Sequence, residues 1–273
     1  MAENLLDKLL ESKKYRDVCP DTVRRIWAEC ARKYKKPKDV DKAAREALHG
    51  ITGAFLSPAE ARECAWAMQA WHAGGRTNAQ LENILNKHAS TRERLPLMAM
   101  DALYARIFEI TGKTDHVLDL ACGINPVYLG ARGIKTTGVD ISQQSVDLVN
   151  AFGKTCGAPV GALCADLLCD NSLPAGRFDV ALLFKVLPLL ERQRAGAALA
   201  VMEAIDAEYI VVSFPTRTLG GRNVGMSAHY AEWMAAHIPQ NRLIAGHFEM
   251  NNELFYVLKE GHYETISAQG SVL

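Results

Sequence analysis

The sequence predicts an α/β fold in its second half, a mostly parallel sheet with helices on both faces, preceded by an all-helical region. From residue 116 onward, short apolar runs of strand length alternate with helical stretches, which is the pattern of parallel strands joined by crossover helices. The last two strand-like runs follow each other with no helix between them. We therefore expect an antiparallel hairpin at one edge of the sheet.

Start and stop signals divide the helical front. Pro20 and Ser57 each mark a helix start, and Pro37 separates the helices between them. We place the boundary between a helical domain, residues 1–110, and a sheet domain, residues 111–273, near Thr111. The expected helical segments are 8–14, a segment from 21, 40–48, 58–73, 79–88 and a connecting helix 92–110.

Seven runs in the second half read as strands, and the helical stretches lie between them. The tail after residue 259 has no such pattern, and we expect it to be loosely ordered. The expected strands are 116–121, 135–140, 159–164, 178–184, 208–214, 243–249 and 253–259, and the expected helices are 142–155, 190–205 and 226–238.

Composition excludes several classes of protein. The 273 residues carry a formal net charge of +0, so any attraction to nucleic acid must be local. Seven cysteines without a CxxC pair, and no signal peptide at the start, indicate free thiols in the cytoplasm. The histidines and cysteines lack metal-ligand spacing, so we expect no metal. No apolar run reaches the roughly 20 residues of a membrane span.

The front end is locally basic. Between Lys13 and Arg45 there are twelve Lys or Arg residues against five Asp or Glu residues, an excess typical of a surface that binds nucleic acid. The alternative is a solvated helix face held by i,i+4 ion pairs. The basic residues come in clusters with few acidic partners at helical spacing: Lys13–Lys14, Arg24–Arg25 and Lys35–Lys36.

A turn after the first strand has the features of a nucleotide-cofactor site. The strand is followed by Ala121, Cys122 and Gly123, and the next strand ends in Asp140. A small-residue turn lets backbone N–H groups approach a ligand, and a carboxylate at the neighbouring strand end can accept hydrogen bonds from both ribose hydroxyls. A turn with one glycine suits S-adenosylmethionine better than a dinucleotide, because binding a pyrophosphate requires several glycines in this turn. A turn that binds nothing remains the other alternative.

Other strand ends add candidate ligand contacts, because ligands of open α/β sheets lie beyond the carboxyl ends of the strands. Asp166 can accept the adenine amino group while Leu167 packs on the ring, or Asp166 caps a turn. Phe184 either walls the sulfonium pocket or belongs to the core. Lys185 either neutralises a phosphate of a target nucleotide or extends into solvent.

Two classes of methyl acceptor are excluded because the sequence lacks the motifs of the enzymes that methylate them. No Asn/Asp-Pro-Pro-Tyr motif of exocyclic amino methyltransferases follows Phe184, and Cys122 lies in the cofactor turn, unlike the nucleophile of a cytosine C5 enzyme. A purine N7, which exposes a lone pair at neutral pH, fits the remaining possibilities. That reaction requires positioning rather than a base.

Two further runs stand out. The glycine-rich segment 214–226 contains Arg217 and Arg222 and follows the fifth strand, so it either contacts RNA or is a surface connection. In the run His-Ala-Ser-Thr-Arg-Glu-Arg at 88–94, Ser90 or Thr91 can cap a helix. Arg94 can reach the cofactor carboxylate in a bidentate contact.

Together these blocks resemble the aminoglycoside-resistance 16S rRNA (guanine-N7) methyltransferases. The resemblance extends to about residue 259, and its motifs include Asp-Leu-Ala-Cys-Gly-Ile-Asn-Pro at 119–126 and Phe-Lys-Val-Leu-Pro-Leu-Leu-Glu at 184–191. The other matching segments are 12–16, 20–25, 48–50, 53–55, 88–94 and 214–222.

The resemblance implies a Rossmann-like S-adenosylmethionine-dependent sheet behind an rRNA-docking helical domain. It implies methylation of N7 of one guanine in the decoding A site, in the helix 44 region of 16S rRNA within the assembled 30S subunit. S-adenosylhomocysteine would be the product, and high-level aminoglycoside resistance the consequence, because N7 methylation removes an acceptor and fixes a positive charge. It also implies a cytoplasmic monomer without a membrane partner.

Residue roles follow from the same resemblance. The implied cofactor-binding residues are Phe55, His88, Ala89, Ser90, Arg94, Ala121, Gly123, Asp140, Asp166, Leu167, Phe184 and Gln193. The target nucleotide would be addressed by Lys185, Glu191, Arg217, Arg222, Met226 and Glu253, of which Lys185, Glu191, Arg222 and Glu253 form the catalytic set. The helical domain would dock on rRNA through Lys13, Lys14, Arg16, Arg24 and Arg25.

Two other functions compete with this interpretation. A small-molecule methyltransferase would use the helical front as a lid over its substrate. A non-catalytic rRNA-binding assembly factor would keep the fold without binding the cofactor.

Overall fold

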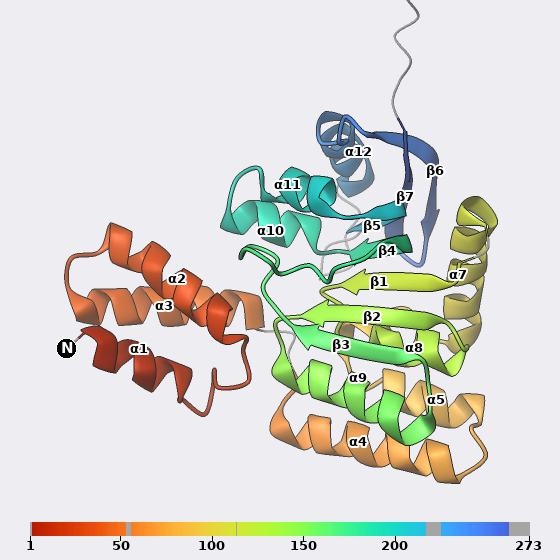
Figure 1. The fold of residues 1–273 in the computed structure, drawn as a ribbon, viewed down its shortest axis with the longest axis horizontal. Coiled ribbons are helices and arrows are strands. Elements are labelled where there is room, and N and C mark those ends of the chain that lie inside the picture. The colour runs from red at the N-terminus through yellow and green to blue at the C-terminus, as the bar shows by residue number, and fades with distance from the viewer. Residues whose placement is uncertain (1, 53–55, 113, 217–224, 262–273) are drawn as a thin grey trace, which may run out of the picture.

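The computed structural model describes residues 2–52, 56–112, 114–216 and 225–261. Within these ranges seven strands form one sheet in the order β3-β2-β1-β4-β5-β7-β6 (Figure 1). The strands are β1 (His116–Leu120), β2 (Lys135–Asp140), β3 (Val160–Cys164), β4 (Phe178–Phe184), β5 (Ala207–Pro215), β6 (Arg242–Met250) and β7 (Glu253–Glu260).

The sheet is parallel from β3 to β5 and antiparallel at its β7–β6 end. β1 pairs with β2 and β4, β2 pairs with β3, and β4 pairs with β5, all parallel. β7 runs antiparallel to both β5 and β6. The predicted fold class is therefore confirmed, and the hairpin inserts its second strand next to β5, where Glu253 pairs with Pro215.

The sheet's helices differ in two places from those expected. A helix that the sequence analysis did not include, α8 (Asn125–Ala131), directly follows the turn after β1. The expected helix 190–205 is two helices, because Gly196 adopts φ +79° at the start of the second. The helices of the second half are α8, α9 (Gln143–Cys156), α10 (Leu187–Gln193), α11 (Ala197–Ala204) and α12 (Met226–Ala236).

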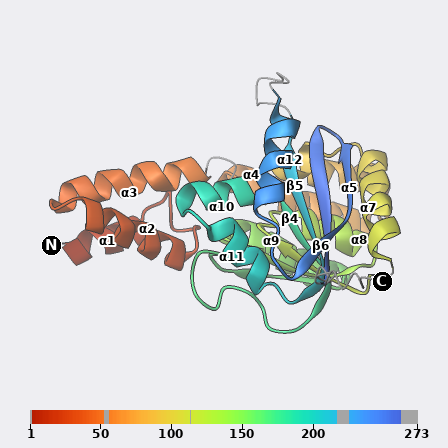
Figure 2. The same cartoon turned by 90° about the horizontal axis from the view of Figure 1, so that it is seen from above.

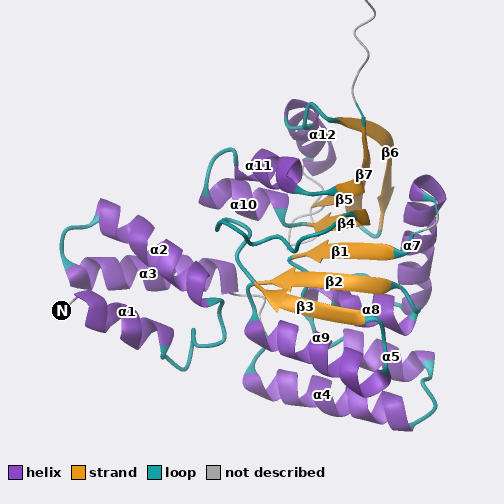
Figure 3. Cartoon of the chain, in the orientation of Figure 1, coloured by secondary structure: helices purple, strands orange, loops and turns teal. Residues whose placement is uncertain are grey.

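In its described part, the chain before β1 consists of helices joined by loops (Figure 3). Ser57 begins a helix as expected, through a capping box with Glu60. The expected connecting helix 92–110 begins later, after Pro96, because a short helix comes first. The helices are α1 (Ala2–Leu10), α2 (Pro20–Lys33), α3 (Pro37–Thr52), α4 (Pro58–Ala73), α5 (Asn78–Leu85), α6 (Ala89–Arg92) and α7 (Leu97–Thr111).

Buried apolar side chains divide the helical front into two parts. Helices α4, α5 and α7 share one hydrophobic core with α8, α9 and one face of the sheet, and α10, α11 and α12 cover the other face. Helices α1, α2 and α3 enclose a core of their own around Leu9, Val23 and Trp27. We call residues 2–52 the α1–α3 unit. The domain boundary near residue 110 stays a prediction, and the hydrophobic cores separate earlier, before α4.

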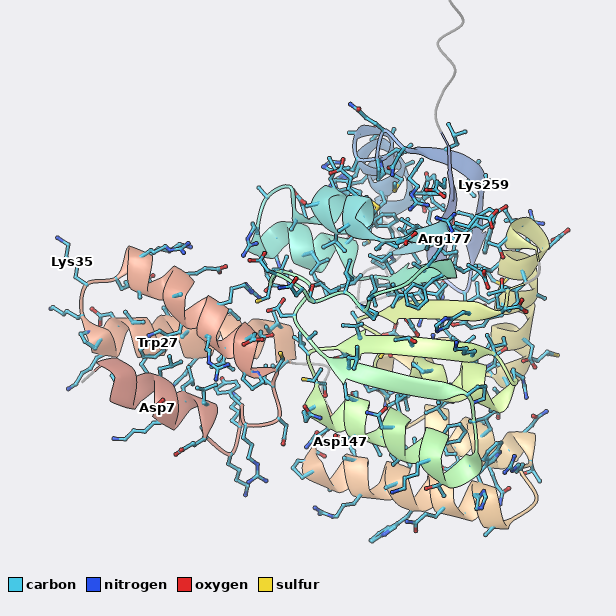
Figure 4. All side chains as sticks on the ribbon, viewed as in Figure 1. Asp7, Trp27, Lys35, Asp147, Arg177 and Lys259 are labelled. Atoms are coloured by element: carbon cyan, nitrogen blue, oxygen red, sulfur yellow. The ribbon has the colours of Figure 1, made fainter. Side chains whose placement is uncertain are left out.

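The α1–α3 unit lies beyond the carboxyl ends of the parallel strands, as Figures 1 and 2 show. Its backbone meets the loop after β2: the Cys19 N–H donates to the Ile141 carbonyl at 2.7 Å, and the Gln143 N–H donates to the Asp17 carbonyl at 2.8 Å. In Figure 4, Trp27 lies among the helices of the unit, whereas Lys35 lies at the end away from the sheet. The basic front therefore adjoins the edge at which ligands of such sheets bind.

Within the described ranges, no helix combines the length and the apolar character needed to cross a bilayer.

Two tryptophans of α4 test whether this helix belongs to the sheet's core. Trp71 is buried against Phe152 of α9, with ring centroids 5.3 Å apart, while Trp66 is 65% exposed. Trp71→Ala should lower the free energy of unfolding by about 3–5 kcal/mol, since it leaves a large cavity. Trp66→Ala, the matched control, should change it by less than about 0.5 kcal/mol. Equal effects in urea denaturation would contradict this packing.

Candidate cofactor and RNA site

A cavity of about 280 Å³ opens at the carboxyl ends of the parallel strands. Most of its walls come from the turn after β1, the ends of β2 and β4, the loop after β3, α6 and α10, and α2 and α3 add one residue each. Its lining residues are Arg25, Ile51, His88, Ala89, Ser90, Glu93, Ala121, Gly123, Val139, Asp140, Ile141, Ser142, Ala165, Asp166, Leu167, Phe184, Lys185, Val186, Leu189, Leu190 and Gln193. The structure thus brings ten of the twelve expected cofactor residues together.

Two other pockets, formed by described residues, lack the strand-end carboxylates Asp140 and Asp166. A larger depression of about 550 Å³ lies between the loop 167–173 and α11, away from Asp140 and Gly123. In the described ranges, no group of three or more His, Cys, Asp or Glu side chains is arranged to hold a metal ion. The strand-end cavity is therefore the candidate site.

The turn after β1 requires a small residue. Gly123 has φ +52°, and a Cβ there would lie 2.7 Å from His88 Cε1. Ala121 also has a positive φ of +56°, a strained backbone that is often found at ligand sites. The Gly123 N–H donates to Asp140 Oδ2 at 2.7 Å, and the Ser142 N–H donates to Asp140 Oδ1 at 2.8 Å. The turn and the strand end are thereby held together.

The carboxyl group of Asp140 is buried. Burial raises the pKa of its carboxyl group, and hydrogen bonds from the backbone N–H groups of Gly123, Ser142 and Ile141 oppose that rise. The carboxylate lines the cavity next to Val139. It is thus oriented by the protein while one side remains available to a ligand.

Asp119 lies beneath the turn rather than in the cavity. Asn125 Nδ2 donates to Asp119 Oδ2 at 2.7 Å, and the Asn125 amide also bonds the Tyr104 hydroxyl. Burial raises the pKa of Asp119 to about 7. Its contact is with the first residue of α8, so it supports the turn from below.

The segment that precedes α7 forms another wall. His88, not Ser90 or Thr91 as expected, caps α6, because its Nδ1 accepts from the Ser90 N–H at 3.3 Å and lies 2.8 Å from Ser90 Oγ. The Thr91 hydroxyl instead donates to the carbonyls of Leu85 and His88. Burial, assisted by Arg92, lowers the pKa of His88 to about 4. The imidazole is therefore neutral near pH 7.

A buried ion pair lies behind this wall. An Arg94 guanidinium nitrogen is 3.0 Å from Glu253 Oε2, and the two side chains are 3% and 1% exposed. Arg94 also donates to the Ser90 carbonyl at 3.0 Å, and its guanidinium carbon lies 4.7 Å from the Phe184 ring centroid. Arg94 was expected to hold a cofactor carboxylate, but it does not line the cavity; it contacts Ser90 and Phe184, which do.

Glu253 contacts three groups on different elements. Besides Arg94, the Ser213 hydroxyl of β5 donates to Oε2 at 2.8 Å, and Lys185 Nζ lies 3.2 Å from Oε1. Desolvation raises the pKa of Glu253, but Arg94 and Lys185 outweigh it and hold that pKa below its ordinary value. The buried Glu253 carboxylate therefore connects three elements at this end of the sheet.

Lys185 closes β4 in a strained conformation. Its φ is +57°, and its N–H donates to the Ser213 carbonyl at 3.0 Å. Its ammonium group contacts Glu93 of the wall segment as well as Glu253. Lys185 lines the cavity, and its side chain is partly exposed.

At the opposite end of the cavity, Arg25 of α2 reaches across to the sheet region. Arg25 Nε donates to Asp166 Oδ2 at 2.9 Å, and a terminal guanidinium nitrogen donates to Gln193 Oε1 at 2.9 Å. The Arg25 and Asp166 side chains are 8% and 4% exposed. Arg25 was grouped with the rRNA-docking residues, but its guanidinium is committed to this buried pair and does not face outward.

Glu191 also has a structural contact that the sequence analysis did not include. Its carboxylate accepts from the Gly196 N–H at 2.7 Å and the Ala198 N–H at 3.2 Å, which caps the start of α11. Glu191 does not line the cavity. This placement does not favour contact with a target nucleotide.

The other expected site residues divide between exposed positions and residues outside the described ranges. Met226 begins α12 and is half-buried. The side chains of Lys13, Lys14, Arg16 and Arg24 are exposed on the α1–α3 unit. Phe55, Arg217 and Arg222 lie outside the described residues.

Sequence reasoning missed several residues of the cavity. Glu93 was assigned only to a helix first turn, although its place in the run 88–94 was a usable signal. Ile51 and Leu189 had no signal, because an apolar residue on a helix is usually a core residue. Arg25 was predicted as an rRNA-docking residue, and its contact with Asp166 in the cavity was not predicted.

The parallel sheet with its antiparallel β7, the single-glycine turn and the strand-end carboxylates define a Rossmann-like methyltransferase fold. The family model described as "Ribosomal RNA methyltransferase (FmrO)" matches residues 11–257. The chain therefore belongs to the FmrO family of ribosomal RNA methyltransferases, and the predicted family and enzyme class are confirmed.

Individual relatives agree with this membership. A 16S rRNA (guanine(1405)-N(7))-methyltransferase of Serratia marcescens is 41% identical over 256 residues, covering 93% of this chain and 97% of its own length. The crystal structure of 16S rRNA methyltransferase RmtF in complex with S-adenosyl-L-homocysteine is 42% identical, with a TM-score of 0.85 over 95% of this chain and 98% of that one. The structure of RmtB is 37% identical, with a TM-score of 0.82 over 96% and 99% of the two chains.

The buried neutral His88 predicts a pH effect on stability. In the unfolded chain its pKa returns to 6.5, whereas the folded value is about 4. The unfolded state therefore takes up a proton first, and the free energy of unfolding should fall between about pH 7 and about pH 5. His88→Asn keeps a capping acceptor that does not titrate, so urea denaturation at the two pH values should show a smaller difference. An unchanged difference would contradict the assignment.

Proposed function

We propose that this chain transfers a methyl group from S-adenosylmethionine to N7 of guanine 1405 of 16S rRNA in the assembled 30S subunit, leaving S-adenosylhomocysteine. The observation that carries the proposal is a strand-end cavity with a ribose-binding carboxylate, Asp140, beside an exposed basic helical unit. The names of the relatives support the base and the position, and the RmtF complex supports the cofactor.

The cavity's residues fit the cofactor. Gly123 leaves open the space that a Cβ would fill, Asp140 offers a carboxylate for the ribose, and Asp166 offers one at the adenine end, where Leu167 is apolar. Arg25 is the basic residue that lines this end of the cavity. Its guanidinium is hydrogen-bonded to Asp166 and Gln193, so it does not offer a free cation for a pyrophosphate. When bound, S-adenosylmethionine supplies an electrophilic methyl group on its sulfonium.

The target nucleotide would be positioned rather than activated. A guanine N7 carries an exposed lone pair at neutral pH, so the protein does not have to remove a proton before the methyl group is accepted. Lys185 provides a cation at the cavity, held by Glu93 and Glu253, that can neutralise a nucleotide phosphate. Phe184, restrained by Arg94, provides an aromatic wall.

Docking on rRNA is assigned to the α1–α3 unit. Its exposed Lys13, Lys14, Arg16 and Arg24 belong to the unit whose Arg25 and Ile51 line the cavity. Cations on one surface release counterions from a phosphate backbone and supply affinity without base reading. We extend this proposal to Met226, Arg217 and Arg222, which follow β5 in the sequence, as contacts to the target nucleotide.

The biological consequence follows from the product. A methyl group on N7 removes a hydrogen-bond acceptor and fixes a positive charge at the decoding site. A polycationic aminoglycoside would then lose a contact and meet repulsion, which gives resistance. We propose that the chain acts in the cytoplasm on ribosomal subunits, as a monomer, near helix 44 of the rRNA.

The test incubates the chain with labelled S-adenosylmethionine and purified 30S subunits, followed by aniline cleavage at 7-methylguanosine. We expect label in 16S rRNA and cleavage at guanine 1405. Label on small molecules of a cell extract, with none on 30S subunits, would favour the small-molecule methyltransferase. Binding of subunits without any S-adenosylmethionine binding would favour the assembly factor.

Asp140→Ala should weaken S-adenosylmethionine binding by about tenfold or more, because two hydrogen bonds to a carboxylate are lost. Isothermal calorimetry measures the affinity. Asp140→Asn, which keeps one acceptor oxygen, should lose less. Asp147→Ala, at an exposed position on α9, is the matched control and should bind as the wild type does. Unchanged affinity in Asp140→Ala would refute the ribose assignment.

Replacing Lys13, Lys14, Arg16 and Arg24 with Glu should weaken 30S binding by about a hundredfold or more at moderate salt. Binding of S-adenosylmethionine should stay within about twofold, since none of the four lines the cavity.

The control for this variant replaces two exposed lysines at the other end of the strands, Lys135 and Lys154, with Glu. Filter binding should show little loss of 30S affinity in this control. A loss of binding free energy in the control about half that of the fourfold variant, in proportion to the change in charge, would mean that net charge, and not the α1–α3 unit, sets the affinity.

A further inference from the structure

The adenine end of the cavity is built partly from the rRNA-docking unit. Arg25 of α2 and Ile51 of α3 are lining residues, although both belong to a unit with a separate hydrophobic core. Arg25 contacts Asp166 and Gln193. Asp166 was expected to hold the cofactor because of its place after a strand, and Gln193 because of the family resemblance. One arginine therefore joins the docking unit to the cofactor site.

The geometry of Arg25 is that of a fixed connection. Its two bonds to Asp166 and Gln193 are both 2.9 Å long, and Glu29 of the same helix lies 3.3 Å from its third nitrogen. Glu29 in turn lies 3.5 Å from Arg194, next to Gln193. A planar guanidinium with three directed partners links α2 to the loop after β3 and to α10 in this arrangement.

The rest of the contact between the unit and the sheet region lies on the same side of the molecule. Asp17, Val18 and Cys19 meet the segment 141–144, directly after Asp140, through backbone hydrogen bonds and an isolated bridge. Gln144 Nε2 also donates to Asp17 Oδ2 at 3.0 Å. The unit thus touches the loops that follow both carboxylates of the cavity, Asp140 and Asp166.

These contacts are mainly polar, and the hydrophobic core of the unit is not continuous with that of the sheet. Polar contacts of this kind between units of one chain leave their relative position sensitive to small energy differences. A ligand that packs between Arg25, Ile51 and the strand ends would stabilise one position of the unit. The exposed cations of α1–α3 would then be presented to rRNA in that arrangement.

We propose that Arg25 is a positioning residue that couples cofactor binding to rRNA docking, an inference that rests on the proposed function. A filled cavity holds the α1–α3 unit through Arg25, and docking on the 30S subunit in turn holds the cofactor. Because such a coupling is reciprocal, each ligand tightens binding of the other by the same factor. Arg25 itself need not touch the RNA.

The experiment measures 30S affinity with and without saturating S-adenosylhomocysteine, at one fixed salt concentration. For the wild type we expect the nucleoside to tighten 30S binding by about fivefold or more. Arg25→Ala should bind 30S equally with and without it. Arg25→Lys, which keeps a charge opposite Asp166 without the fork to Gln193, should give an intermediate ratio.

Arg24→Ala is the matched control, because Arg24 is the exposed neighbour of Arg25 on α2 and pairs only with Asp21 among the described residues. It should weaken 30S binding in both conditions and leave the ratio at the wild-type value. A merely structural defect in Arg25→Ala would lower both affinities with the ratio preserved, and that outcome overturns the proposal. Thermal unfolding checks the fold of each variant. If Arg25→Ala does not fold, Arg25→Gln, whose side chain is of similar length, takes its place.

Failure of this inference differs from failure of the proposed function. A wild-type chain that binds 30S with equal or lower affinity in the presence of S-adenosylhomocysteine contradicts the coupling and leaves the methyltransferase assignment intact. A wild-type chain that does not bind 30S at all contradicts the proposed function, and the coupling with it.

Discussion

The buried ion pair between Arg94 and Glu253 is the contact on which the arrangement of the site depends. It joins the segment between α6 and α7 to the start of β7, at 3.0 Å, with both side chains almost fully buried. Two charges in such a place are tolerated only when each finds its partners, and removal of either leaves the other uncompensated. Glu253 therefore gathers Arg94, Ser213 and Lys185. These contacts connect the start of β7 with the segment before α7, with β5 and with the end of β4, on one side of the cavity.

A second pair does the same at the other side. Asp166 is nearly as buried as Glu253, and its partner Arg25 comes from the α1–α3 unit instead of a neighbouring loop. The requirement that buried charges be paired thus determines which parts of the chain meet at the sheet's edge. Between the two pairs lies the turn with Gly123, and Asp140 is held there by backbone N–H groups rather than by a cation. Asp140 lines the cavity at this point.

Much of this could be predicted from local patterns. The strands and the hairpin at the edge depend on residues close in sequence, whose hydrophobic periodicity is visible directly. The same holds for the turn at Gly123 and the strand end at Asp140, which small residues mark. Their meeting at one edge follows from parallel strands ending together. The family resemblance added residues such as Gln193 and Ser90, which no local pattern would have selected.

What could not be predicted depends on partners far apart in the chain. Arg25 reads as one of a basic cluster, and only its distance to Asp166, 141 positions away, reveals a buried pair. Glu191 reads as an acidic residue near the site, yet it caps a helix that begins where Gly196 breaks the pattern. The limit of the hydrophobic cores near residue 52 could not be predicted for the same reason, because a helix's own sequence does not show which other elements cover its apolar side chains.

A double-mutant cycle on the free energy of unfolding tests the central claim most directly. Arg94→Met and Glu253→Gln should each cost about 3 kcal/mol or more, because each leaves a buried polar group without its partner. The double variant should cost at least about 2 kcal/mol less than the sum of the two, since the second change removes the group that the first had left unpaired. Additive costs would contradict the claim that this pair organises the site.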